Sequence, residues 1–247
     1  MKAIVLILLL FFVEQLLTVV LGHGLLAAGW VGGREVAYGV ASFPVQLLFI
    51  MSLAWLGLVR RRLPTDRMPM RTGSTLAALG ATAALMLALG GATDLVGVDD
   101  GGTTVFFSAM KGNPICLVSL ALVGPLTEEV VFREGLVRHM VRSGLNRYAA
   151  AVLAALVFAL VHGNAAQGIP AFVLGTLFGV FYVTTGDLRL PVVAHVLVNT
   201  SGLVSYYLTP MSDEATGIAT RLILIVSCTL AAVALLVAWQ RLRLRNL

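Results

Sequence analysis

Long stretches of apolar residues dominate this chain of 247 residues, and most of them are close to 20 residues long. A helix needs about 20 apolar residues to cross a hydrocarbon core of roughly 30 Å. Because lipid offers the backbone no hydrogen-bond partner, such stretches cross a membrane as helices. The pattern predicts an all-α, polytopic membrane protein with about eight transmembrane helices. The predicted spans are Ala3–Leu21, Val36–Val59, Ser74–Gly91, Ile115–Met140, Ala149–His162, Ile169–Thr185, Leu190–Leu208 and Gly217–Gln240.

The composition also indicates a membrane protein. Hydrophobic residues make up 59% of the chain and charged residues 12%, and the mean hydropathy is +0.95. Soluble domains carry about 25% charged residues, so this chain has too little polar surface for one. The polar connections are short, and we expect a single transmembrane domain over residues 1–247. The net charge of +5 does not indicate a nucleic-acid partner, because Lys and Arg lie between the apolar stretches and form no basic face.

The distribution of Lys and Arg predicts the orientation, because cytoplasmic segments are enriched in these residues. With the N-terminus inside and eight crossings, thirteen basic residues fall inside, three fall outside, and Arg133 falls within a span. The inside residues are Lys2, Arg60, Arg61, Arg62, Arg67, Arg71, Arg138, Arg142, Arg147, Arg189, Arg241, Arg243 and Arg245. The outside charged residues are Arg34, Lys111, Arg221, Asp94, Asp99, Asp100, Asp213 and Glu214. The sequence therefore predicts an N-in, C-in topology.

The fourth predicted span contains charged residues in the sequence Thr-Glu-Glu-Val-Val-Phe-Arg. A charge in mid-membrane costs about 2.5–3.5 kcal/mol on insertion scales, so each one requires an explanation. Glu129 and Arg133 stand at i, i+4, the spacing of a helical ion pair. Glu128 is rotated by about 100° around the helix and is expected to face a cavity. These residues carry either chemistry or a structural network between helices, and the motif alone does not decide.

A second pair, Glu134 and Arg138, also stands at i, i+4, nearer the predicted cytoplasmic end of the span. We expect this pair to lie on a solvated face, and His139 beside it has no evident task.

Two further spans carry polar motifs. Phe158 and His162 are one turn apart at the end of the fifth span, and His195 and Asn199 are one turn apart in the seventh. The second pair is either an interhelical hydrogen-bonded pair or two donors aimed at an oxyanion. Buried separately, polar groups on three spans would leave many donors and acceptors unpaired. We therefore expect them to converge in one site.

Straight spans would place His162 and His195 near opposite ends of the membrane. Convergence therefore needs a tilted or broken helix, and we expect the break at Gly163–Gly168 or at Pro191. Irregular backbone is tolerated there if it lines a cavity.

The three motifs together, Glu-Glu-x-x-x-Arg, Phe-x-x-x-His and His-x-x-x-Asn, occur in this order. They resemble the CPBP family of intramembrane proteases, which includes type II CAAX prenyl endopeptidases and the Abi proteins linked to bacteriocin processing or immunity. The similarity covers roughly residues 120 to 201, and the resemblance implies a catalytic core over residues 115–208. Family members commonly have Gly directly after the motif Arg, whereas Glu134 intervenes here before Gly135.

The resemblance implies a role for each motif residue. Glu128 and His162 would activate a water for attack on a peptide carbonyl, and His195 and Asn199 would stabilise the oxyanion. The supporting residues would be Glu129, Arg133 and Phe158. We expect no cofactor, and a zinc ion held by Glu128, His162 and His195 is the alternative.

The leading interpretation is therefore an intramembrane endopeptidase of a prokaryotic plasma membrane. Its expected partners are membrane lipids and a peptide or protein substrate, with or without a lipid modification. The alternatives are a non-catalytic immunity or scaffold protein that binds a peptide in the same cavity, and a small transporter with a Glu/His proton relay. Replacing Glu128 separates the endopeptidase from the immunity or scaffold protein, because only the catalytic role requires its carboxylate. The transporter fits the buried ionisable residues but not the order of the three motifs.

Overall fold

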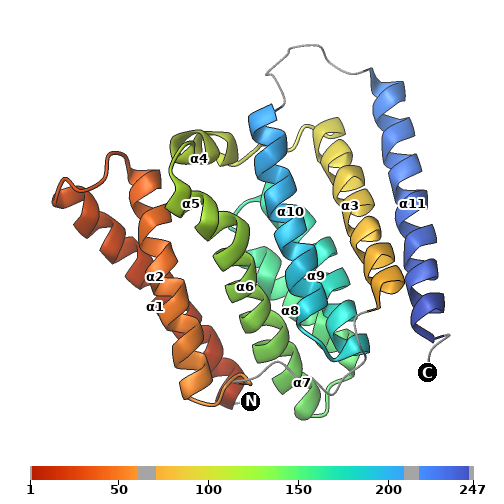
Figure 1. Ribbon diagram of the computed structural model, residues 1–247, viewed down its shortest axis with the longest axis horizontal. Helices are drawn as coiled ribbons and strands as arrows, with labels where there is room; N and C mark the ends of the chain where they lie inside the picture. The colour runs from red at the N-terminus through yellow and green to blue at the C-terminus, as the bar shows by residue number, and fades with distance from the viewer. Residues whose placement is uncertain (1, 61–70, 209–216, 245–247) are drawn as a thin grey trace. The chain divides into compact units, whose positions relative to one another are not determined.

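The computed structural model describes residues 2–60, 71–208 and 217–244, and every regular element over these residues is a helix (Figure 1). The all-α prediction is confirmed. The chain divides into two compact units, of which unit 1 comprises Met1–Leu63 and Gly102–Ala154 and unit 2 comprises Pro64–Gly101 and Ala155–Leu247. The single-domain assignment over residues 1–247 stays a prediction.

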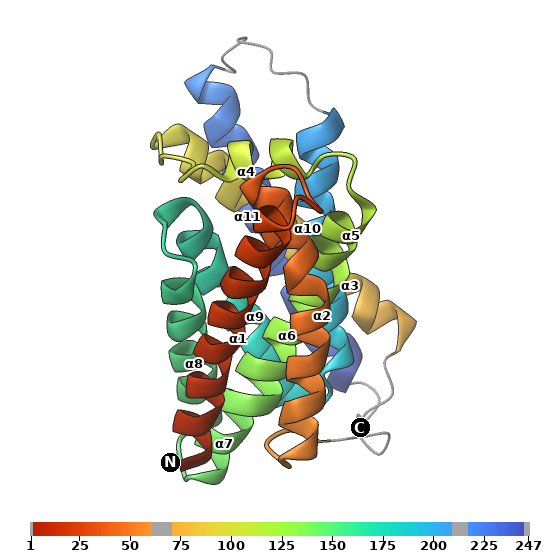
Figure 2. The ribbon, with the colours of Figure 1, turned by 90° about the vertical axis from the view of Figure 1, so that its left-hand side faces the viewer.

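Unit 1 begins with a helical hairpin. Helices α1 (Lys2–Ala27) and α2 (Arg34–Trp55) run antiparallel and lie side by side (Figure 2). Helix α4 (Thr103–Met110) then leads to one long helical run from Pro114 to Arg142. This run consists of α5 (Pro114–Val118), the π-helical segment η1 (Ser119–Val123), α6 (Gly124–Glu129), the π-helical segment η2 (Val130–Val137) and α7 (Arg138–Arg142).

Aromatic packing joins α1 to both neighbours within unit 1. The ring of Phe11 lies 5.7 Å from that of Phe132 on η2, edge to face, and 6.4 Å from that of Phe49 on α2. On the other side of α2, a Cβ atom at Gly39 would lie 2.7 Å from the Cys116 Sγ on α5. The absence of a side chain at Gly39 therefore allows α2 and α5 to pack closely.

Unit 2 contains α3 (Thr72–Leu95), α9 (Ala165–Thr185), α10 (Arg189–Leu208) and α11 (Ile218–Leu244). Its core combines small and large apolar side chains from all four helices: Ala77, Ala78, Leu174, Leu177, Phe178, Phe181, Leu190, Ala194 and Trp239. Helix α8 (Arg147–Val161) contains the boundary between the units. The core fixes α10 at Ala194, directly before the predicted site residue His195.

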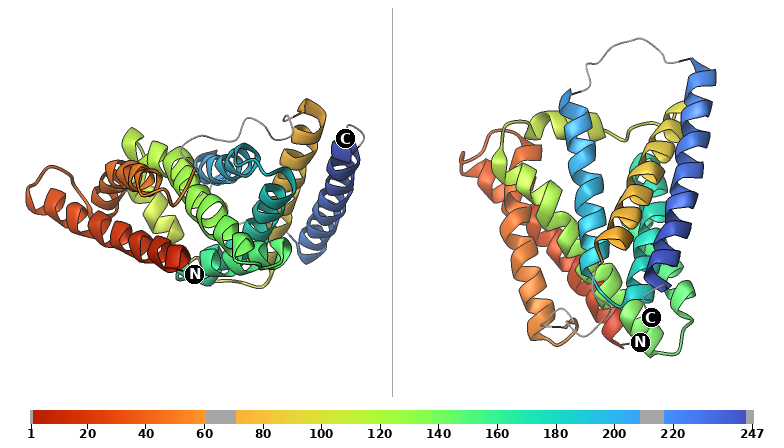
Figure 3. Two further views of the ribbon diagram at one scale, coloured as in Figure 1. Left: turned by 90° about the horizontal axis from the view of Figure 1, so that it is seen from below. Right: turned by 45° about the vertical axis from the view of Figure 1, so that its right-hand side comes forward.

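Helices α3 and α11 pack antiparallel along their length (Figure 3, yellow and blue). Added Cβ atoms at Gly80 and Gly91 would lie 3.2 Å from Leu235 Cδ1 and 3.1 Å from Ile225 Cγ1, respectively. Two apolar helices gain little from the hydrophobic effect in lipid, so close backbone approach at such glycines supplies much of their packing.

Each of the eight predicted spans contains a helix in the structure, and the prediction of a polytopic membrane protein is confirmed. Among the described residues, six helical segments are long and apolar enough to cross a membrane. Helix α8 is apolar but shorter, and α10, which carries His195 and Asn199, is not among the six. The number of crossings and the N-in, C-in orientation stay predictions. Part of the charge pattern behind that orientation lies outside the described residues, namely Arg61, Arg62, Arg67, Asp213, Glu214 and Arg245.

Candidate active site

The Glu-Glu-x-x-x-Arg motif of unit 1 lies where α6 passes into the π-helical segment η2. A first π-helical segment, η1, precedes α6, and there the Gly124 N–H bonds to the Ser119 carbonyl five residues back. Pro125 follows directly and has no N–H of its own, so the regular α-helical ladder is interrupted at this point. Such wide turns occur frequently at functional sites.

Glu129 and Arg133 form the predicted ion pair. The Arg133 Nη1 donates to the Glu129 Oε1 over 2.8 Å, and the two side chains are 1% and 0% exposed. Breaking a buried pair of this kind leaves an uncompensated charge and is strongly destabilising. The pair therefore fixes the α6–η2 junction that carries Glu128.

Glu128 is half-buried at the end of α6. Its charge acts on Arg133 in addition to that of Glu129, and it also acts on Glu14 of α1. Arg133 is therefore within electrostatic reach of both glutamates of the motif, and it makes its ion pair with Glu129.

The prediction that Glu134 and Arg138 lie on a solvated face is wrong, although the pair itself exists. Glu134 is 3% exposed and lies 3.0 Å from the Arg138 Nε. Both carboxylate oxygens of Glu134 also accept hydrogen bonds from Arg60, whose Nε and Nη2 each donate over 2.6 Å. Arg138 Nη2 and His139 Nε2 lie 2.6 Å and 2.9 Å from the Leu58 carbonyl oxygen. These residues connect η2 and α7 to the segment after α2, which gives His139 a structural role.

In unit 2, the end of α8 brings Phe158 and His162 together. Their rings meet edge to face with centroids 4.8 Å apart. Helix α8 ends at Val161, and Gly163 adopts a φ of 72°, which Gly tolerates far better than other residues. The chain therefore turns at the predicted Gly163–Gly168 segment, although α9 already begins at Ala165. Pro191 causes no break, because it lies in the first turn of α10, where Pro is compatible with a helix.

The His162 ring is held by a backbone hydrogen bond. Its Nδ1 lies 2.7 Å from the Phe158 carbonyl oxygen. A carbonyl oxygen can only accept, so the Nδ1 carries the proton and the Nε2 of the neutral ring carries the lone pair. The ring thus presents one defined acceptor atom, which is the state that a base or a water-orienting group requires.

His195 lies between two aromatic rings of unit 2 and is 5% exposed. Its ring centroid is 5.8 Å from that of Phe158 and 5.4 Å from that of Phe178. Asn199 follows one turn later on α10 and is half-buried. The Phe158 ring therefore packs against the rings of both His162 and His195, and Asn199 lies one turn after His195 on α10.

The sequence reasoning missed two residues that position this group. Asn164 caps α9 by accepting from the Gln167 N–H over 2.9 Å, and its Nδ2 donates to the His162 carbonyl oxygen over 3.3 Å. The sequence Asn-Ala-Ala-Gln after a glycine is a helix-start signal that predicts this cap. Phe178 was not singled out, because an apolar residue in an apolar helix carries no sequence signal of a contact with a histidine.

The alternative zinc site draws Glu128 from unit 1 and His162 and His195 from unit 2. Within neither unit do the described residues include three His, Cys, Asp or Glu side chains grouped to hold a metal ion. The expectation that no cofactor is needed stays a prediction.

Residues 111–201 match the family model of type II CAAX prenyl endopeptidase Rce1-like proteins. This segment, called the Rce1-like segment below, is similar to that family. It contains all three motifs that the sequence analysis singled out, which confirms the predicted resemblance to the CPBP family. No solved structure matches the chain.

Two curated relatives resemble the chain over a similar length. The candidate membrane peptidase YdiL of Bacillus subtilis is 23% identical over 105 residues, or 42% of this chain and 43% of YdiL. The membrane-embedded CAAX protease MroQ of Staphylococcus aureus is 34% identical over 103 residues, or 39% of this chain and 41% of MroQ. The chain thus matches less than half of the length of each. The Rce1-like segment and the apolar helices show a membrane-embedded, protease-like protein.

Proposed function

We propose that this protein is an endopeptidase that hydrolyses a peptide bond of a membrane-associated substrate. In this proposal Glu128 and His162 activate the attacking water, and His195 and Asn199 stabilise the oxyanion. Glu129, Arg133 and Phe158 hold these groups in place. These roles are the ones that the resemblance of the three motifs implies, and all of these residues lie within residues 111–201, the range that matches the Rce1-like family model.

The proposed reaction needs no covalent intermediate with the enzyme. Glu128 takes a proton from water while the water oxygen attacks the carbonyl carbon, and the carbonyl oxygen becomes an oxyanion. Glu128 then returns the proton to the leaving amine as the C–N bond breaks. Hydrogen-bond donors of His195 and Asn199 stabilise the oxyanion strongly, because the negative charge that develops there lies in a medium of low dielectric constant.

The observation that best supports this proposal is the fixed ring of His162. Because its Nδ1–H is bonded to the Phe158 carbonyl oxygen, the Nε2 can accept a hydrogen bond from water and orient its lone pair toward the substrate. His23 makes the same kind of bond to the Val19 carbonyl oxygen over 2.9 Å, but it lies outside the Rce1-like segment, whereas His162 lies within it beside His195.

The substrate class, the cofactor requirement and the location are parts of the same proposal. We propose a peptide or protein substrate, with or without a lipid modification, and membrane lipids as the surroundings. We propose a metal-free reaction and a prokaryotic plasma membrane.

The test is cleavage of a panel of fluorogenic peptides, lipidated and unlipidated, by the detergent-purified full chain. Glu128→Gln and His162→Ala are each expected to lower the rate by about 10²–10⁴-fold, the usual contribution of a general acid–base group. Asn199→Ala is expected to lower it by about 10²–10³-fold, the usual effect of removing one oxyanion donor. Glu35→Gln and His23→Ala are the matched controls and should cleave like the wild type.

Each outcome decides a different part of the proposal. Cleavage that a chelator does not affect supports the metal-free route, whereas loss on chelation moves the mechanism to zinc. If Glu128→Gln cleaves as fast as the wild type, the assigned mechanism is wrong. If no peptide is cleaved and a cellular phenotype survives Glu128→Gln, the protein acts by binding and is not an endopeptidase.

A further inference from the structure

Glu14 in the middle of α1 is a buried carboxylate without a cationic partner. Four carboxylates are buried among the described residues, and three of them form ion pairs with arginine, namely Glu129, Glu134 and Asp187. Glu14 is 3% exposed and forms no such pair with any described residue. A buried charge is costly unless it is paired, and an ionisable residue within an apolar span usually has a function. The mechanism proposed above gives Glu14 none.

The hydrogen bonds of Glu14 lie within its own helix and leave its charge uncompensated. One carboxylate oxygen accepts from the Gln15 Nε2 over 2.7 Å and the other from the Thr18 Oγ1 over 3.3 Å. Both donors are neutral. A carboxylate offers about four acceptor positions, so Glu14 can accept further hydrogen bonds. The charge that acts on Glu14 in the described part of the chain is that of Glu128, which is also negative.

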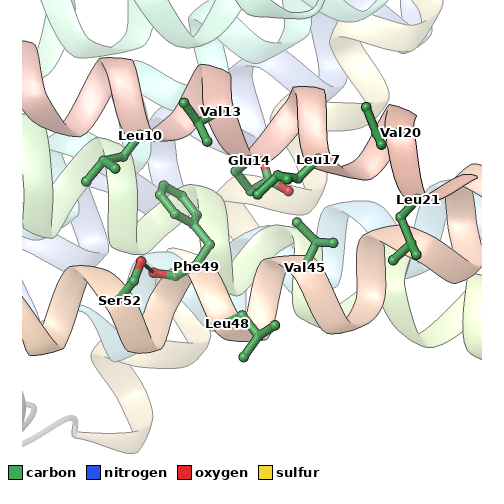
Figure 4. A pocket seen from close by; sticks show the side chains of 10 residues that line it. All are labelled: Leu10, Val13, Glu14, Leu17, Val20, Leu21, Val45, Leu48, Phe49 and Ser52. Carbon is green, nitrogen blue, oxygen red and sulfur yellow. Dashed lines mark hydrogen bonds between the residues drawn. The ribbon is translucent and has the colours of Figure 1, made fainter.

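Glu14 lines a cavity of about 520 Å³ between α1 and α2 (Figure 4). The other polar lining residue is Ser52, whose hydroxyl donates to the Phe49 carbonyl oxygen over 2.7 Å, so its oxygen is left to accept. The remaining eight lining residues are apolar. Because both polar groups of the cavity are acceptors, the polar part of a ligand here has to donate. This excludes carboxylate and phosphate groups as the part of a ligand that meets Glu14.

The two polar groups divide the cavity along its length. Figure 4 shows Leu10 and Ser52 at one end, Val20 and Leu21 at the other, and Glu14 between them. The part of the cavity from Glu14 to Leu21 therefore has apolar walls alone. A ligand that fits both parts has a polar group at Glu14 and an aliphatic chain that runs toward Leu21.

The cavity opens to the surroundings of the α1–α2 hairpin. Four of its lining side chains are 49–64% exposed, namely Val13, Leu17, Val20 and Leu48. In a membrane-embedded chain such side chains face lipid, whose tails are as apolar as leucine. The volume lies within the range of small-molecule sites, about 300–1,000 Å³. A ligand therefore enters from the bilayer, which requires an amphiphile that dissolves there.

We propose that this cavity binds a membrane amphiphile that carries an aliphatic chain and a primary ammonium group. The ammonium donates to the Glu14 carboxylate and supplies the missing positive charge, and the chain lies along the apolar walls toward Leu21. An ammonium group has three donors and no acceptor, whereas a hydroxyl has one donor and no charge. The site lies outside the three motifs and does not depend on the proposed endopeptidase activity.

The first test is photolabelling of the detergent-purified full chain by dodecylamine that carries a diazirine near the end of its alkyl chain. Mass spectrometry should place the label on the α1 and α2 residues that line the cavity. Unlabelled dodecylamine should compete about 10–100-fold better than dodecanol, the usual scale of a hydrogen bond to a charged group. Equal competition by dodecanol, or a label outside α1 and α2, would overturn the proposal.

The second test uses variants of the two parts of the cavity. Glu14→Gln should remove the preference for dodecylamine over dodecanol, and Glu35→Gln is its control and should retain it. Leu17→Trp fills the apolar part and should abolish labelling. Leu16→Trp should not, because Leu16 is 62% exposed and does not line the cavity.

These variants keep the proposal falsifiable. If Glu14→Gln does not fold, the comparison of Leu17→Trp with Leu16→Trp still tests the site. Equal labelling of these two variants would refute it, as would a preference for the amine that survives in folded Glu14→Gln. His162→Ala should label like the wild type even though it is expected to stop cleavage, so the ligand site and the endopeptidase are tested separately.

Discussion

The His162 Nδ1 donates to the Phe158 carbonyl oxygen one turn earlier, over 2.7 Å. The bond predicts that neutral His162 carries its proton on Nδ1. Nitrogen NMR of the chain labelled at histidine should show this tautomer for two of the four histidines, His162 and His23, because the Nδ1 of His23 lies 2.9 Å from the Val19 carbonyl oxygen. His162→Gln should remove one of the two signals and leave the other. A signal for His162 protonated at Nε2 would contradict the geometry and the role proposed for this residue.

The buried Glu129–Arg133 pair predicts a large loss of stability when one partner is removed. Glu129→Ala or Arg133→Ala leaves an unpaired charge at a site that is 0–1% exposed, and should lower the free energy of unfolding by about 3–5 kcal/mol. Unfolding by SDS in detergent micelles measures the change. The double variant Glu129→Leu with Arg133→Met should recover part of the loss, because no charge is then left unpaired. Single variants as stable as Arg142→Gln, on the exposed end of α7, would contradict this prediction.

Removing Glu134 is expected to cost more stability than removing Arg60, one of the two arginines that it binds. Glu134→Ala leaves both Arg60 and Arg138 without their carboxylate and should cost about 3 kcal/mol. Arg60 is 25% exposed and Arg138 would still pair with Glu134, so Arg60→Ala should cost about 1 kcal/mol or less. The same unfolding assay tests the order of the two effects, and equal losses would contradict it.

Two adjacent glycines of α3 give a matched pair of variants in unit 2. A Cβ at Gly91 would lie 3.1 Å from the Ile225 Cγ1, whereas nothing lies within 4 Å of one at Gly90. Gly91→Ile should therefore destabilise the α3–α11 pair by about 1–3 kcal/mol, as overpacking usually does. Gly90→Ile should leave thermal stability in detergent nearly unchanged. Equal melting temperatures for the two variants would show that α3 and α11 do not approach as closely as described.

The features that depend on local sequence could be predicted. Hydropathy is a property of each segment alone, so each of the eight predicted spans contains a helix, whereas the short helix α4 between two of them was not predicted. The i, i+4 rule identified the Glu129–Arg133 pair. Glu134 was misjudged because its second partner, Arg60, lies 74 residues away and no local pattern indicates it. The π-helical segments and the contact of Phe178 with His195 likewise depend on packing that spacing does not reveal. The four proposed catalytic residues stay predictions, since their assignment rests on motifs.

The position of the Phe158 ring in unit 2 limits which substitutions related sequences can accept. Phe158 meets both His162 and His195 edge to face, so one rigid side chain with two torsion angles orients both imidazoles. A substitution at position 158 would disturb both rings at once and could not be compensated at either histidine alone. The three positions are therefore expected to change together among related sequences, or not at all.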